Sequence, residues 1–189
     1  MRKLALAVLV VVCGLGFIGS VYAAALEKGE TVYTRSNLRL DGNTIFWHNM
    51  SALRGRLPVG TEAKIEKCTG GSIVFVTNDT NKSYRIAANS GKWNKFLVKD
   101  KKEIGLDGIS SDKRSQIENG EAAAGMTKEA VYASRGCPAY IAWGKTSERK
   151  TFDDIMKSDT WYYMANSRGH STMVTFADGI VAKTGGFEK

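Results

Sequence analysis

Residues 125–138 read Gly-Met-Thr-Lys-Glu-Ala-Val-Tyr-Ala-Ser-Arg-Gly-Cys-Pro and predict a short helix with both ends marked. Thr127 is expected to be the N-cap, because its hydroxyl can accept a backbone N–H of the first turn. Met126 and Val131 occupy the two positions of a hydrophobic staple. Gly136 is expected to end the helix in the left-handed conformation with positive φ, and the proline two residues later cannot continue it. A helix of about two turns is not stable alone in water, so we expect it to dock on a sheet.

Such a sheet is predicted further along the chain. Residues 160–164 (TWYYM) and 172–176 (TMVTF) are rich in β-branched and aromatic residues, which favour strands. Asp178-Gly179 then marks a hairpin that leads into a third strand. Residues 116–120 read as the end of an earlier helix. The C-terminal half is therefore expected to contain two helices followed by a three-stranded antiparallel meander.

From Ile117 to about Thr184 the chain resembles the SmpA/OmlA (BamE-like) family, which includes a subunit of the outer-membrane barrel-assembly machine. The matching residues are Ile117, Gly120, Gly125, Met126, Thr127, Val131, Gly136, Pro138, Trp161, Tyr163, Phe176, Asp178 and Gly179. The resemblance implies a small exported α+β domain over residues 112–184. It also implies that this domain works by protein contact in the cell envelope, in the context of outer-membrane assembly.

The N-terminal half shows short predicted strands separated by turns rich in Gly, Asn and Asp, a pattern typical of a small barrel or sandwich. The predicted strands are 31–34, 38–40, 44–48, 63–68, 72–77 and 82–87. Residues 33–40 (YTRSNLRL) and 57–61 (LPVGT) are similar to segments of bacterial SH3-like domains. We therefore expect an SH3-like β domain over residues 28–98.

The segment between the halves, residues 99–111, is charged and contains glycine, so it is interpreted as a linker, with Ser110 or Ser111 able to cap a helix from Asp112 onward. Each half is at the lower end of the size that folds alone, so the two are expected to pack together. The predicted fold class is α+β, with a small all-β SH3-like barrel followed by the two-helix, three-stranded-meander domain.

The first 25 residues read as a secretory signal peptide. Arg2 and Lys3 precede an apolar run, and small residues follow it, so cleavage is expected after Ala23 or Ala25; an uncleaved anchor is the alternative. Cys13 lies within the apolar run and has no small residue before it, so we do not expect a lipoprotein. The mature protein is predicted to be periplasmic.

The chain is basic, but its charges are interspersed. Loss of Arg2 and Lys3 with the signal lowers the formal net charge from +8 to +6. Lysine and arginine alternate with acidic residues, as in residues 99–103, which is typical of a solvated surface rather than a nucleic-acid groove. We predict no nucleic-acid partner and at most peripheral contact with a membrane.

Two cysteines remain in the mature chain, Cys68 and Cys137, one in each half. In an oxidising compartment they could form one disulfide. The alternative is that both are small buried apolar residues. The sequence has no Cys-x-x-Cys, so a thioredoxin-like redox role has no support.

No catalytic, metal or cofactor site is predicted from the sequence. His48 and His170 do not stand at the spacing of metal ligands or of a catalytic triad. Asp153 and Asp154 point apart as neighbours, and they are better explained as first-turn charges of a short helix over residues 151–157. The Gly-x-Gly-x-x-Gly pattern at residues 14–19 lies inside the export signal. It lacks the flanking strand and helix that such a pattern needs to bind a dinucleotide.

The leading interpretation is an exported, non-catalytic interaction or assembly module of the bacterial cell envelope, whose partners are envelope proteins. The alternative is a cell-wall-associated enzyme, or a regulator or inhibitor of one, that holds peptidoglycan through its SH3-like half.

Overall fold

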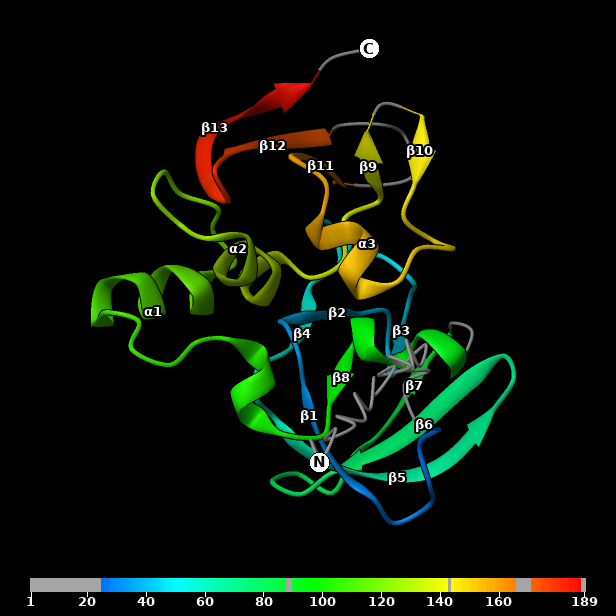
Figure 1. The fold of residues 1–189 in the computed structure, drawn as a ribbon. Coiled ribbons are helices and arrows are strands. Elements are labelled where there is room, and N and C mark those ends of the chain that lie inside the picture. The colour runs from blue at the N-terminus through cyan, green and yellow to red at the C-terminus, as the bar shows by residue number, and fades with distance from the viewer. Residues whose placement is uncertain (1–24, 88–89, 143, 166–170, 188–189) are drawn as a thin grey trace, which may run out of the picture.

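A computed structural model describes residues 25–87, 90–142, 144–165 and 171–187, and its mixture of three α-helices with mainly antiparallel sheets confirms the predicted α+β class (Figure 1). Cys13, the signal segment up to residue 24 and His170 lie outside these ranges. None of the helices in the described part of the chain is long and apolar enough to cross a bilayer.

The N-terminal half is built on a curled six-stranded sheet with the strand order β3-β7-β6-β5-β1-β8. Its strands are β1 (Thr31–Thr34), β3 (Thr44–Ile45), β5 (Glu62–Thr69), β6 (Ser72–Thr77), β7 (Ser83–Ile86) and β8 (Leu97–Val98). A smaller sheet pairs β2 (Leu38–Leu40) with β4 (Gly55–Leu57). The 3-10 helices η1 (Ser90–Lys95) and η2 (Lys101–Ile104) flank β8.

Most of the strands predicted in this half are confirmed, with two corrections. The strand expected over residues 44–48 ends at Ile45, because β3 pairs with β7 over two residues only and the chain then leaves the sheet. Strands β4 and β8 were not predicted, since three and two residues are too few to show an alternating pattern.

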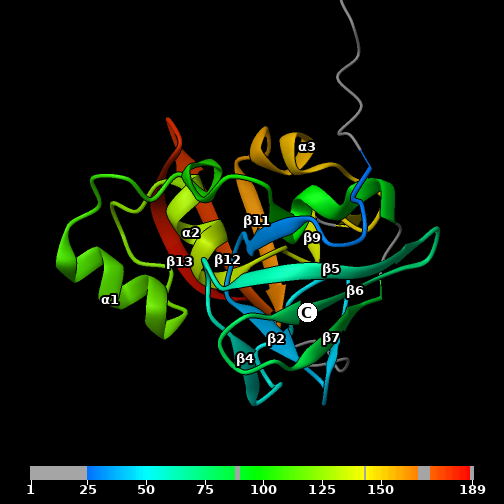
Figure 2. The same cartoon turned by 90° about the horizontal axis from the view of Figure 1, so that it is seen from below.

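The C-terminal half contains a five-stranded antiparallel sheet with the order β10-β9-β11-β12-β13. The strands are β9 (Tyr140–Ala142), β10 (Lys145–Thr146), β11 (Thr160–Met164), β12 (Ser171–Ala177) and β13 (Ile180–Phe187), and the helices are α1 (Ser111–Asn119), α2 (Lys128–Arg135) and α3 (Phe152–Met156). In Figure 1 the sheet lies at the top, and α2 and α3 lie between it and the N-terminal strands. Helix α1 projects at one end of the molecule in both views (Figure 1, Figure 2).

The predicted meander is present as β11, β12 and β13, but it is part of a larger sheet. Along the chain, α2 and the meander are separated by strands β9 and β10 and by helix α3. The hairpin prediction is confirmed, since Asp178 and Gly179 have φ of 50° and 77° and join β12 to β13. The short helix predicted over residues 151–157 is α3, which Thr151 caps by accepting the N–H of Asp154.

Helix α2 begins as the sequence indicates but ends differently. The Thr127 hydroxyl accepts the N–H of Ala130 at 3.2 Å, which confirms the N-cap. Gly136 has the predicted positive φ of 72°, but its ψ of −160° places it outside the left-handed helical region that we expected. That combination of angles is essentially restricted to glycine. It also directs the chain into the junction with the N-terminal half.

The core of the C-terminal half extends into the segment expected to be a linker. Val98 and Ile104 are buried in the same cluster as Val131 and Trp161 of the helix and sheet. Residues 99–111 contain η2, which begins with a capping box formed by Asp100 and Glu103. This segment is therefore a packed connection, and the expectation that the halves pack together is confirmed.

The disulfide considered between Cys68 and Cys137 is not formed, and both thiols are free. Cys68 lies on β5 and packs against the N-terminal core, whereas Cys137 is buried in the C-terminal core. The two cysteines thus belong to separate hydrophobic clusters, and only Cys137 is the buried apolar residue that the second alternative described.

Candidate functional site: the junction cleft

The junction between the halves is held by two buried asparagines from the N-terminal half. The last carbonyls of a helix have no partner within it and must be satisfied from outside. Here Asn37 donates its backbone N–H to Ala133 O at 2.8 Å and its Nδ2 to Ser134 O at 3.0 Å. Asn49 donates its Nδ2 to Arg135 O at 2.7 Å. The C-terminus of α2 is therefore capped by the other half of the chain.

Asn37 also fixes the neighbouring elements. Its Nδ2 donates to Ile117 O of α1 at 2.6 Å, and its Oδ1 accepts the N–H of Val59 at 3.0 Å. Its carbonyl accepts the Nδ2 of Asn49 at 2.6 Å. One buried side chain therefore determines how α1, α2 and the loop after β4 are placed relative to one another. We call Asn37 and Asn49 the asparagine clasp.

A third buried contact joins the halves on the far side of α2. Lys95 of η1 is only 1% exposed, and its Nζ donates to Ser147 O at 3.2 Å and Glu148 O at 3.0 Å. The hydroxyl of Tyr132 donates to the Lys95 carbonyl at 3.0 Å. The junction is therefore packed and hydrogen-bonded on this side as well.

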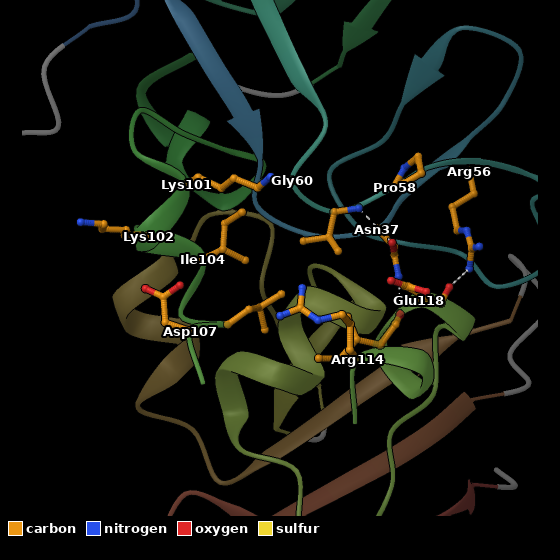
Figure 3. A pocket seen from close by; sticks show the side chains of 13 residues that line it. Asn37, Arg56, Pro58, Gly60, Lys101, Lys102, Ile104, Asp107, Arg114 and Glu118 are labelled. Carbon is orange, nitrogen blue, oxygen red and sulfur yellow. Dashed lines mark hydrogen bonds between the residues drawn. The ribbon is translucent and has the colours of Figure 1, made fainter. Parts of the chain in front are cut away.

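Beside the clasp the two halves leave a cavity of about 530 Å³, which we call the junction cleft (Figure 3). Its walls come from the loop after β4, from η2 and the turn that follows, and from α1. Five apolar side chains line it, namely those of Pro58, Val59, Ile104, Leu106 and Ile117. A cavity of this size with an apolar surface is typical of a binding site for a small ligand or a protruding side chain.

The rim of the junction cleft is charged. Its basic residues are Arg56, Lys101, Lys102 and Arg114, and its acidic residues are Asp107 and Glu118. The ion pairs found among the described residues involve none of these six side chains. In Figure 3, Arg114 extends from α1 toward the middle of the cavity. The rim therefore carries an excess of positive charge that no acidic side chain of the cleft pairs with directly.

The two free cysteines and His48 lie outside the junction cleft. Cys137 is buried with its Sγ 3.4 Å from Ser147 Oγ, and burial raises the pKa of its thiol, so the reactive thiolate is disfavoured. Half-buried His48 has a pKa lowered by burial, and its Nδ1 has no hydrogen-bond partner. In the described ranges, no three His, Cys, Asp or Glu side chains are grouped so that they could hold a metal ion.

Of the residues that carry the family resemblance, the structure places only Ile117 in the cleft. Met126, Val131, Trp161, Tyr163 and Phe176 join the C-terminal core. The glycines mark turns, and the ring of Trp161 meets that of Phe176 at 4.6 Å. The motif therefore encodes the scaffold, and the cleft residues Arg56 and Arg114 were missed because nothing in the local sequence indicates that they meet.

A comparison with protein-family models, with curated proteins and with solved structures gives no significant match.

Proposed function

We propose that this protein is an exported, non-catalytic interaction module of the bacterial cell envelope, and that it holds a segment of a partner protein in the junction cleft. The observation that carries the proposal is the combination of an apolar cavity with a rim of four basic and two acidic residues, none of which takes part in the ion pairs found among the described residues. Interfaces of this kind use a buried apolar anchor for affinity and complementary charge for orientation and association rate.

The chemistry of the cleft defines the partner segment. One apolar side chain would fill the floor against Ile104 and Ile117, and acidic residues beside it would face Lys102 and Arg114. The clasp keeps the cavity open without a partner, so little conformational entropy is lost on binding. The occupant that we propose is therefore an acidic protein segment with an exposed apolar residue.

The finer fold assignment belongs to the same proposal. The order α1, α2 and then the meander β11 to β13 supports a SmpA/OmlA-like C-terminal half, in which β9, β10 and α3 are an insertion. The curled sheet containing β5, β6 and β7 supports an SH3-like N-terminal half. Both assignments favour recognition of another molecule over catalysis.

Site-specific crosslinking tests the proposal. A photo-reactive amino acid is placed at Arg114 in the cleft and, as a control, at Lys64, which is exposed on β5. The full chain with a C-terminal tag is expressed in the native organism and irradiated in living cells. We expect a specific adduct with an envelope protein from position 114 only. Equal labelling from both positions, or sedimentation with purified sacculi without any protein adduct, would overturn the proposal, and the second result would support the peptidoglycan-binding alternative.

A further inference from the structure

A second hollow, also of about 530 Å³, lies on the other side of η2 and has a different composition. Lys101 and Lys102 of η2 are lining residues of the junction cleft, whereas Glu103 of the same helix lines this second hollow. The remaining lining residues are Arg35, Trp93, Asn94, Lys99, Phe152 and Asp153. We call it the Arg35 pocket.

Arg35 is the unusual member of this pocket. The residue is only 7% exposed, and its guanidinium carbon lies 3.9 Å from the centre of the Phe152 ring. Its Nη1 donates to Glu103 O at 3.1 Å, but its Nη2 is 3.8 Å from Glu103 Oε2, which is too long for a hydrogen bond, and its Nε has no partner. A buried charge is normally fully paired and hydrogen-bonded, because desolvation is costly. Arg35 therefore has hydrogen-bonding capacity that the protein leaves unused.

The carboxylates around Arg35 do not supply the hydrogen bonds that its guanidinium lacks. Glu103 is half exposed and its carboxylate also accepts the N–H of Asp100 at 3.0 Å. Asp153 is exposed at the first turn of α3 and forms no ion pair within the described structure. Burial lowers the pKa of Arg35, and the negative charges of Glu103 and Asp153 raise it only in part.

The second positive group of the pocket is Lys99. Its ammonium pairs with Glu30 at 2.6 Å and lies 5.6 Å from the centre of the Trp93 ring. The Arg35 pocket therefore presents two positive groups and two carboxylates beside aromatic side chains. Because Lys99 is already paired with Glu30, and Glu103 lies beside Arg35, the groups left for a ligand are the guanidinium of Arg35 and the carboxylate of Asp153, one of each sign. A ligand that carries both charges matches this pair.

We propose that the Arg35 pocket binds a free amino acid or short peptide through its two charged end groups, with the ligand carboxylate on Arg35 and the ligand ammonium on Asp153. A planar guanidinium is the side chain best suited to a carboxylate, and its stacking on Phe152 fixes the plane in which the two can pair. This binding site is separate from the junction cleft and does not depend on the function proposed for it.

The test uses the purified protein and four probes that differ only in their end groups. These are alanyl-alanine, N-acetyl-alanyl-alanine, alanyl-alanine amide and the doubly blocked N-acetyl-alanyl-alanine amide. Binding is followed by shifts of the backbone amide NMR signals. We expect alanyl-alanine to shift residues of η1, η2 and α3 with a Kd on the order of 1 mM. Each single block should weaken binding about two- to fivefold, as expected for the loss of one partly exposed ion pair.

The exposed carboxylate of Asp153 provides a variant that leaves the buried Arg35 in place. Asp153→Asn should weaken alanyl-alanine about two- to fivefold and leave N-acetyl-alanyl-alanine unchanged, because that probe has no ammonium. Asp112→Asn is the matched control, since it removes the same charge from an exposed first-turn position of another helix, α1, that does not line the pocket. Absence of localised shifts, equal binding of all four probes, or an Asp153→Asn effect on both zwitterionic and acetylated probes would overturn the assignment.

Discussion

The amide carbon Cγ of Asn49 lies only 2.8 Å from the position that a Cβ on Gly136 would occupy, and its Nδ2 lies nearer still. Glycine is thus required at position 136 for two separate reasons. Its backbone angles are restricted to glycine, and the space beside it is filled by the side chain that caps α2. The end of one helix and the closure of the junction are therefore decided at a single position.

Gly136→Ala should destabilise the protein by about 3 kcal/mol or more, because backbone strain is added to the loss of the Asn49 hydrogen bonds. Urea unfolding of the purified protein measures it. Gly108→Ala is the matched control: Gly108 also has a positive φ, of 75°, but a Cβ there would meet nothing within 4 Å. Only the strain remains in the control, so its cost should be about 1 kcal/mol. Equal costs for the two variants would contradict the clash with Asn49.

Asn37→Leu should destabilise by about 3 kcal/mol or more, since the buried carbonyls of Ile117 and Ser134 and the N–H of Val59 would lose their partner. Asn78→Leu, which removes an exposed asparagine that contacts Glu62, should change the stability by less than about 0.5 kcal/mol. Equilibrium unfolding followed by both near- and far-UV circular dichroism makes the comparison. A similarly small effect at Asn37 would show that the clasp does not hold the halves together.

Charge reversal in the junction cleft should reduce partner capture without reducing stability. Lys102→Glu combined with Arg114→Glu is expected to weaken capture about tenfold or more in low salt, and the difference should shrink as salt is added. The control is Lys28→Glu combined with Lys64→Glu, which changes the net charge by the same amount but at exposed residues away from the cleft. Comparable losses in the two double variants would mean that net charge, rather than the cleft, drives capture.

The two free cysteines should differ in reactivity toward an alkylating reagent. Cys137 is buried, and burial raises the pKa of its thiol, so little thiolate is available at neutral pH. Cys68 is only partly buried. Mass spectrometry after brief exposure to iodoacetamide should find Cys68 modified first, and urea should abolish the difference. If Cys68, in the protein isolated from its native compartment, reacts only after reduction, that thiol is bridged there.

The N-terminal residue of the mature protein distinguishes a cleaved periplasmic protein from a lipoprotein. We expect mass spectrometry of the native protein to find a start at Ala24 or Leu26. Leu26 is itself only 5% exposed and packs in the N-terminal core, so trimming beyond it should lower stability. An acylated Cys13 at the N-terminus would instead show a lipoprotein, and the protein would then be anchored to a membrane.

The sequence predicts those features that depend on neighbouring residues. The N-cap at Thr127, the turn at Asp178-Gly179 and the cap of α3 each involve residues no more than three apart, so local chemistry is enough to place them. Strands β9 and β10 were missed because they are short and are stabilised by pairing with β11 and with each other. Their own residues carry no clear alternation.

The two sites could not be predicted from local sequence patterns for a similar reason. The junction cleft combines Arg56, Lys101 and Arg114, and the Arg35 pocket combines Arg35 with Phe152 of α3. Such residues meet only after Asn37 and Asn49 have reached the end of α2, through hydrogen bonds that span 97 and 86 residues. Neither asparagine differs from an ordinary turn residue when it is read in the sequence alone.

These separations also determine the order in which the protein can be completed during its synthesis. Asn37 and Asn49 leave the ribosome long before the carbonyls of residues 133–135 that they cap. Until the second half emerges, the Nδ2 of Asn37 and the Nζ of Lys95 lack the carbonyl partners that they bind in the finished fold. The side chains of Asn37 and Asn49 therefore reach their final contacts only after residue 135 has been synthesised, however early the sheet beside them forms.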